Sequence, residues 1–289
     1  MKMLRLCLAT LLATLVAAGA AQARPPVWVV RDKDSELVLF GSVHLLPPGM
    51  DWRPPQLVKA LNAADDVWFE LPIDPATEAE TARVASELGA LAPDQSLFKL
   101  LPTQEGARML RVAQAYGVDP AVLDRLKPWL ADIALSSAAY SKAGAAGKDG
   151  VEVAVSTAAP PHAARRAFET AREQVEILAG ASQAEQIAAL SNTLSEMEDE
   201  PDEFAQLLRA WMAGDLKALD REALDPLRKA APGLFKRLLT DRNARWTQIL
   251  DGRLKGSGRT VVVVGMGHLI GPDGVPARLR ALGYQVEGP

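Results

Sequence analysis

Short apolar runs bounded by polar or proline-rich segments occur near both ends of the chain. Residues 27–30 and 37–40 flank the polar residues 31–36, a pattern typical of a β-hairpin. Residues 67–69 form a third run, within a predicted strand over residues 66–70, and residues 261–264 form a fourth near the C-terminus. Because these runs are continuously apolar and end at turn signals, they predict buried strands.

The middle of the chain has a different pattern. From residue 75 to residue 256 the apolar positions recur with a helical period, and proline or glycine marks the breaks. Ser182 and Glu185 form a capping box at the start of one of these helices. After a final helix at about residues 275–282, the chain returns to strand. The sequence therefore predicts an α/β fold: a central sheet built from N- and C-terminal strands, with a large helical insertion.

The first 23 residues have the features of a secretory signal peptide. Lys2 and Arg5 precede an apolar stretch over residues 6–18, and residues 21–23 form a small-x-small cleavage pattern. The apolar stretch is shorter than the roughly 20 residues that span a bilayer. We therefore expect export to the periplasm or the exterior, with no stable membrane anchor after cleavage. The expected organisation is a signal peptide (1–23) and one domain (24–289), with sheet-forming parts at 24–74 and 257–289 and a mainly helical insertion at 75–256.

Composition narrows the possible chemistry. The formal net charge is −4, and no long basic run is present, so nothing indicates nucleic-acid binding. Cys7 is the only cysteine and lies in the predicted signal peptide, which excludes disulfides and thiolate metal sites from the mature protein. Any metal ion must therefore be held by His, Asp and Glu. The sequence does not indicate an oligomeric state.

Two of the three histidines lie in a repeated Gly-x-x-His pattern. Gly41 and His44 follow one predicted strand, and Gly265 and His268 follow another, with a further glycine at Gly267. Both copies leave the carboxyl end of a strand, the edge where ligands bind in open α/β sheets. Glycine there permits a positive φ and close approach of the backbone.

Glu70 ends the third apolar run and is the candidate partner of these histidines. A carboxylate in apolar surroundings is costly unless it is paired or bound to a metal. Two imidazoles and a carboxylate suit Zn, Mn, Co or Fe and leave a position open for water. Glu70 would then be a ligand or a general base. A single histidine would more often be a satisfied core or loop residue, but the repeat favours a shared site.

A dinucleotide-binding βαβ unit is the rival interpretation of the C-terminal copy. Its glycine pattern departs from the fingerprint, because Ile270 stands where the third glycine belongs. The N-terminal copy has no matching glycines. No signature of a serine hydrolase, a zinc protease helix or a P-loop is present.

Several short motifs, taken in order, resemble the TraB/PrgY/GumN family. They are Gly41-Ser42-Val43-His44-Leu45-Leu46-Pro47, Glu70-Leu71-Pro72, Phe168-Glu169-Thr170 with Gln174, Trp211 with Gly214-Asp215, Arg242-Asn243, and Val264-Gly265-Met266-Gly267-His268-Leu269-Ile270-Gly271. The family is similar to the Tiki proteins, metalloproteases that depend on manganese or cobalt. The resemblance implies an active centre of His44, Glu70 and His268.

The resemblance also implies supporting residues and an activity. Arg242 and Asn243 would be polar residues of the active centre, with Arg242 stabilising an oxyanion, and Glu169 and Gln174 would lie on a helix facing the cleft. The expected activity is that of an exported metal-dependent hydrolase, with a peptidase acting on a peptide or protein substrate favoured. Manganese or cobalt is the expected ion, with zinc as an alternative. Two other functions stay open: a peptide-sequestering protein without turnover, and a metal-independent, esterase-like hydrolase.

Overall fold

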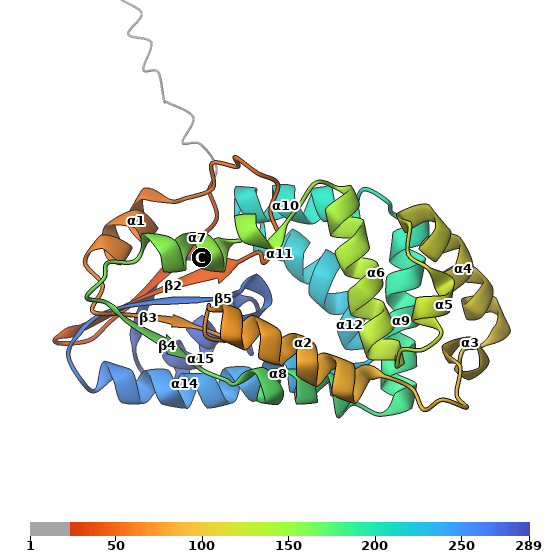
Figure 1. The fold of residues 1–289 in the computed structure, drawn as a ribbon. Helices are drawn as coiled ribbons and strands as arrows, with labels where there is room; N and C mark the ends of the chain where they lie inside the picture. The colour runs from red at the N-terminus through yellow and green to blue at the C-terminus, as the bar shows by residue number, and fades with distance from the viewer. Residues whose placement is uncertain (1–23) are drawn as a thin grey trace, which may run out of the picture.

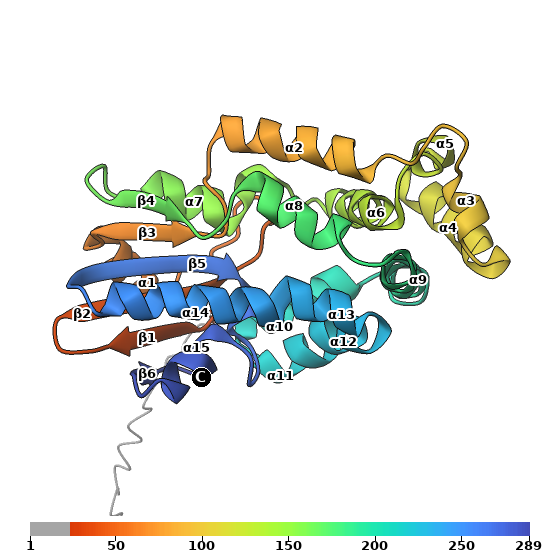
Figure 2. The same ribbon diagram turned by 90° about the horizontal axis from the view of Figure 1, so that it is seen from below.

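A six-stranded sheet forms one half of the protein and packed helices form the other (Figures 1 and 2). The computed structural model describes residues 24–289, so the predicted signal peptide lies outside the described residues. The strands are β1 (Val27–Arg31), β2 (Ser35–Ser42), β3 (Asp66–Phe69), β4 (Ala164–Ala167), β5 (Gly258–Gly265) and β6 (Gln285–Glu287). Their order across the sheet is β4-β3-β5-β2-β1-β6. The predicted α/β fold is confirmed.

The sheet brings the two ends of the chain together. β1 and β2 form the predicted antiparallel hairpin. β5 lies between β2 and β3 and is parallel to both, so these three strands end at one edge. That edge faces the helical half, as the arrowheads of β3 and β5 show in Figure 2. Ser42 lies opposite Gly265, which places the two Gly-x-x-His loops side by side.

Helices cover both faces of the sheet and build the other half. α1 and α7 lie over one face and α14 lies over the other (Figure 1). The helices are α1 (Pro55–Asn62), α2 (Pro75–Gly89), α3 (Leu97–Leu100), α4 (Thr103–Tyr116), α5 (Pro120–Leu123), α6 (Pro128–Lys142), α7 (Val151–Ala158), α8 (Ala171–Ala179), α9 (Gln183–Asp199), α10 (Glu203–Ala213), α11 (Leu216–Leu219), α12 (Asp225–Ala230), α13 (Pro232–Phe235), α14 (Asp241–Leu254) and α15 (Val275–Ala281). Shorter turns are η1 (Gly147–Asp149), η2 (Asp220–Leu224), η3 (Lys236–Thr240) and η4 (Met266–Leu269). None of the helices between residues 24 and 289 is long and apolar enough to span a bilayer.

Local sequence signals explain several helix ends. The predicted capping box is present at the start of α9, where Ser182 and Glu185 bond each other's backbone N–H groups. Gly214 ends α10 with a φ of 70°, a conformation that favours glycine. Asp215 then caps α11 by accepting from the Ala218 N–H at 3.0 Å.

β4 is the strand that the sequence did not predict. Its Ala-Arg-Arg-Ala sequence has no apolar run, and Ala164, Arg165 and Arg166 are exposed. An edge strand that bonds on one side only, as β4 does with β3, can have polar side chains of this kind. The sheet therefore takes one strand from inside the helical insertion.

Two aromatic clusters pack close to the carboxyl edge of the sheet. Phe40 of β2 stacks on Trp52 at 5.6 Å between centroids and lies 6.2 Å from Trp211 of α10. Phe168 stacks on Trp246 of α14 at 4.8 Å. These buried rings hold α10 and α14 against the strand ends, where the candidate residues lie. The helical half has its own core, which includes Leu97, Met109, Leu123, Leu190 and Leu194.

Candidate active site

His44 lies on the loop after β2, where the amino end of α7 packs against it. Val151 donates its backbone N–H to the carbonyl of Val43 at 3.2 Å. A Cβ atom on Gly150 would lie 2.1 Å from the carbonyl oxygen of His44, so only glycine fits there. This approach brings Glu152 of α7 to 2.5 Å from Nδ1 of His44. Nδ1 of His44 is thereby fixed by Glu152, while 60% of the side-chain area of His44 stays exposed.

Glu70 directly follows β3 and has hydrogen-bond partners on both oxygens. Oε1 accepts the backbone N–H of Gly265 at 2.7 Å. Oε2 accepts from Nε2 of Gln174 at 3.0 Å and from a terminal nitrogen of Arg242 at 2.6 Å. The carboxylate is therefore buried, ionised and fixed in position.

His268 lies in η4, the turn that follows β5, and is buried. Its Nδ1 is 2.6 Å from Oδ1 of Asn243, and its Nε2 is 3.1 Å from a terminal nitrogen of Arg242. Because a guanidinium only donates, Nε2 is the acceptor and Nδ1 carries the proton. The indole of Trp246 packs on the ring at 4.3 Å between centroids.

Arg242 connects these groups from the first turn of α14. Its Nε donates to both oxygens of Glu169, at 3.0 and 3.1 Å. One terminal nitrogen donates to Glu70 and Glu169, and the other donates to the Leu238 carbonyl and to His268. All five N–H groups of the guanidinium therefore have acceptors.

The two histidines and Glu70 converge above Gly265. A Cβ atom on that glycine would lie 3.2 Å from Oε1 of Glu70, 3.7 Å from Cδ2 of His268 and 3.8 Å from Nε2 of His44. Oε1 of Glu70 is 3.7 Å from Nε2 of His268. We call these three residues the His–Glu centre. It borders a cavity of about 280 Å³, the carboxylate pocket, which is lined by His44, Glu70, Leu71, Ile73, Gly147, Glu152, Val153 and Gln174.

The match to a known family extends over almost the whole described chain. A model of the TraB/PrgY/gumN family matches residues 26–288. The chain belongs to the TraB/PrgY/gumN family. Comparison with curated proteins and with solved structures found no match. The family predicted from the motifs is thus confirmed.

The residues singled out in the sequence lie together in this TraB/PrgY/gumN family member. His44, Glu70 and His268 come from the ends of three parallel strands that neighbour one another. Arg242 and Asn243 reach them from α14, where both side chains are buried. The structure thus places these five residues in one site.

Glu169 lies elsewhere than expected. It follows β4 and precedes the N-cap of α8, so it is not on a helix, whereas Gln174 lies on α8 as predicted. The backbone N–H of Glu169 donates to the carbonyl of Glu70 at 3.0 Å. This bond extends the pairing of β3 and β4 by one residue and sets the two glutamates side by side.

The glycines of the two Gly-x-x-His motifs were predicted to need a positive φ or a close approach of the backbone, and only close packing is observed. Gly41, Gly265 and Gly267 all lack a positive φ, so that part of the prediction is wrong. Close packing explains them instead. A Cβ atom on Gly41 would lie 2.5 Å from the sulfur of Met266, and one on Gly267 would lie 3.1 Å from Leu224.

Glu152 belongs to the candidate site by its contacts, and the sequence did not predict it. It is buried, and its Oε1 accepts from the hydroxyl of Ser42 at 2.5 Å as well as bonding His44. The signal was present, because Glu152 lies between Val151 and Val153, in apolar company like that of Glu70. The cost of an unpaired carboxylate in apolar surroundings applies to Glu152 as it does to Glu70.

The three members of the His–Glu centre have different protonation states. The negative charge of Glu152 raises the pKa of His44 to about 9. Burial, with the positive charges of Arg242 and His44 nearby, lowers the pKa of His268 to about 3. Burial alone would raise the pKa of Glu70, but His268, Arg242 and His44 together lower it to about 2. Since His268 is neutral at pH 7, Arg242 and His44 keep Glu70 ionised there.

The nitrogen and oxygen donors of His44, Glu70 and His268 are of the kinds that bind divalent transition-metal ions. Each histidine has Nδ1 fixed by a side-chain oxygen, the arrangement usual for metal-bound imidazoles. Glu70 and His268 are deprotonated at neutral pH, as ligands have to be, whereas His44 with its pKa of about 9 must lose a proton before it can bind an ion. Within residues 24–289, however, no three His, Cys, Asp or Glu side chains are grouped closely enough to hold an ion as they stand. Binding an ion requires Arg242 to release Nε2 of His268.

We expect His44 to titrate far above an ordinary histidine in the metal-free protein. In ¹⁵N NMR with a chelator present, its pKa is expected at about 9, and Glu152→Gln should return it towards 6.5. Because the folded pKa is raised, this ion pair stabilises the fold below about pH 6.5, and the contribution is lost as the pH rises through about 9. Glu176→Gln, an exposed change on α8, should leave the titration unaltered. A pKa of His44 near 6.5 in the wild type would contradict the assignment.

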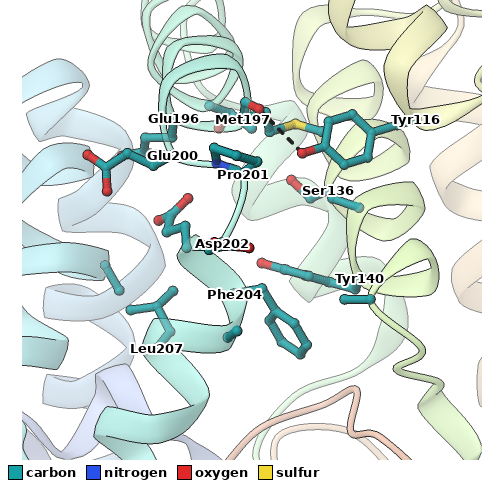
Figure 3. Close-up of a pocket in the computed structure, with 16 residues that line it drawn as sticks. Tyr116, Ser136, Tyr140, Glu196, Met197, Glu200, Pro201, Asp202, Phe204 and Leu207 are labelled. Atoms are coloured by element: carbon teal, nitrogen blue, oxygen red, sulfur yellow. Dashed lines mark hydrogen bonds between the residues drawn. The ribbon is translucent and has the colours of Figure 1, made fainter.

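A second cavity, the acidic pocket, lies between α6, α9 and α10 (Figure 3). Its walls include Tyr140 and the carboxylates Glu196, Glu200, Asp202 and Glu203. Burial raises the pKa of Glu203 to about 7, and repulsion from Glu196 and Glu200 adds to the shift. None of the sequence-predicted site residues lines this pocket.

Glu203→Gln should remove the part of the pH dependence of the unfolding free energy that comes from the Glu203 carboxyl group. The folded protein holds a proton on Glu203 between about pH 4.5 and pH 7 that the unfolded chain releases, so stability falls as the pH rises through this range. Because Glu203 is only half-buried, solvent screening reduces the gain at pH 8 to about 1 kcal/mol. Urea unfolding at pH 5 and pH 8 measures the effect. Asp202→Asn, at the exposed neighbouring position, should leave the pH dependence unchanged, and an equal dependence in Glu203→Gln and wild type would refute the prediction.

Proposed function

We propose that the protein is a hydrolase of peptide bonds, with the His–Glu centre as its reaction site. The observation that carries the proposal is the convergence of His44, Glu70 and His268 above Gly265, at the carboxyl edge of a parallel sheet. Such edges are where α/β proteins bind ligands. The pKa values of His44, Glu70 and His268 are shifted in different directions, and ionisable groups with widely separated pKa values in one pocket are typical of acid–base catalysis.

His44 is suited to donate a proton at neutral pH. Its pKa of about 9 keeps it charged, and Glu152 behind Nδ1 leaves Nε2 facing the centre. In peptide hydrolysis, a water molecule adds to the carbonyl carbon and loses a proton, and the departing amine takes up a proton as the C–N bond breaks. We assign this transfer to His44, with Glu152 as its positioning residue.

Arg242 acts through its neighbours. Its N–H groups are all engaged by Glu169, Glu70, His268 and a backbone carbonyl, so none is free to bind an oxyanion. We therefore assign it the positioning of Glu70 and His268, in place of the oxyanion role expected from the sequence.

A divalent ion is part of the proposal. His44, Glu70 and His268 would hold it once Nε2 of His44 has lost its proton, with manganese or cobalt favoured by the family resemblance. The proton transfer assigned to His44 applies to the centre without an ion. When bound, such an ion lowers the pKa of a coordinated water and polarises a carbonyl group. Export is likewise proposed, from the signal-peptide pattern over residues 1–23.

Incubation with a peptide library tests the proposal. The mature protein, with a chelator or with added Mn²⁺, Co²⁺ or Zn²⁺, is expected to release new peptide termini that mass spectrometry detects. His44→Ala, prepared identically, controls for contaminating proteases. Binding of peptides without any product would favour a sequestering protein. Turnover that persists in a chelator would favour the metal-independent hydrolase.

A further inference from the structure

An apolar cavity of about 270 Å³ adjoins the His–Glu centre. We call it the apolar pocket. His44 lines both this pocket and the carboxylate pocket, and Gly265 forms part of its wall. The rest of the wall comes mainly from α10, with the side chains Phe204, Leu207, Leu208 and Trp211. The two pockets therefore meet at His44.

The walls of the apolar pocket select for apolar groups. Leu219, Met266 and Tyr140 also line it, and the remaining lining residues are Ser42, Val43, Leu45 and Ala223. His44 is the only ionisable group of the lining apart from the Tyr140 phenol. Burial raises the pKa of Tyr140 to about 12, so that phenol stays neutral. A cavity of ~150 Å³ lined by aliphatic and aromatic side chains binds benzene. The apolar pocket is therefore large enough for an aromatic or branched aliphatic side chain.

The far end of the apolar pocket adjoins the acidic pocket. The two share Tyr140, Phe204, Leu207 and Ala223, and Figure 3 shows Tyr140 and Phe204 below the carboxylates. An acidic side chain entering from the His–Glu centre would leave water and approach like charges, both of which are unfavourable. These two costs disfavour acidic groups in the pocket.

We propose that the apolar pocket is the specificity subsite of this enzyme and that it receives a large aliphatic or aromatic side chain of the peptide residue beside the cleaved bond. The inference rests on the proposed function, because it assumes that a peptide crosses the His–Glu centre. A peptide bond above Gly265 places one flank over the carboxylate pocket and the other over the apolar pocket. The preference is then set by side chains that take no part in the chemistry.

A binding experiment tests the subsite without turnover. N-acetyl-phenylalaninamide is expected to shift the NMR methyl signals of Leu207, Leu219 and Met266, whereas N-acetyl-alaninamide should not. Ala223 is exposed on η2 at the pocket wall, so Ala223→Trp can block the pocket without a core change. The shifts should disappear in that variant and persist in Ala107→Trp, a matched change at an exposed position of α4.

Peptides that differ only beside the cleaved bond give the second readout. Phe or Leu is expected to exceed Ala by about 10- to 100-fold in kcat/KM, the usual range for filling a hydrophobic subsite, with Glu lowest. Ala223→Trp should abolish this preference. Methyl shifts without cleavage of any peptide would leave the subsite standing and refute the proposed function. Cleavage with no preference and no methyl shifts would refute the subsite alone, and the absence of both would refute both.

Discussion

Replacing Arg242 with methionine is expected to lower the free energy of unfolding by about 3–5 kcal/mol. The side chains of Glu70 and Glu169 are 10% and 0% exposed, and Arg242 bonds both. Methionine fills a similar volume but leaves the two buried carboxylates without this cation. The pKa of Glu70 then rises, because burial remains while the charge of Arg242 is gone.

Urea unfolding followed by tryptophan fluorescence measures the loss. Arg83→Met is the matched control, because Arg83 pairs with Glu80 and Glu87 on the exposed face of α2, where solvent screening leaves such pairs little effect on stability. The deficit of Arg242→Met should shrink at pH 5, because the raised pKa of Glu70 in the variant lets this buried carboxylate take up a proton as the pH falls. Equal losses in the two variants would show that the buried network does not stabilise the fold.

Glu70→Gln is expected to lower kcat/KM for a cleaved peptide by about 10³-fold. The substitution keeps the shape of the side chain and removes its charge. A glutamine amide presents donors as well as an acceptor, so it cannot accept from Gly265, Gln174 and Arg242 together as the carboxylate does. The centre loses both its negative charge and its fixed geometry.

Assays at pH 7 with the wild type and with Glu176→Gln measure this effect. Glu176 is an exposed glutamate of α8, and its change should leave kcat/KM within about twofold. Unfolding curves show whether Glu70→Gln stays folded, since an unsatisfied buried donor costs about 1–3 kcal/mol. Activity of Glu70→Gln within threefold of the wild type would remove Glu70 from the reaction site.

The sequence predicted the framework of the site because the framework depends on local signals. The runs before His44, Glu70 and His268 are continuously apolar, and each ends in a glycine or a proline-bounded segment. Parallel strands that end together bring their following residues to one edge. Position along the strand was therefore enough to group residues that lie far apart in the chain.

The remainder of the site depends on contacts that no local pattern encodes. β4 has a polar sequence and is a strand only because β3 offers it a partner. Glu152 reaches His44 because Gly150 lets α7 approach the loop, a tertiary contact across more than a hundred residues. The hydrogen bonds of Arg242 to Glu169, Glu70 and His268 join α14 to three other segments of the chain. The spacing of these residues along the sequence does not predict how close they lie in the folded protein.

A double-mutant cycle on His44 and Glu70 tests most directly whether these two residues act in one reaction centre. The kcat/KM of His44→Ala, Glu70→Gln and the double variant is measured on one cleaved peptide. Residues that act in a single step give losses that are strongly non-additive. We predict that the double variant is within about threefold of the less active single variant. Losses that multiply would show that His44 and Glu70 act independently and would contradict a shared centre.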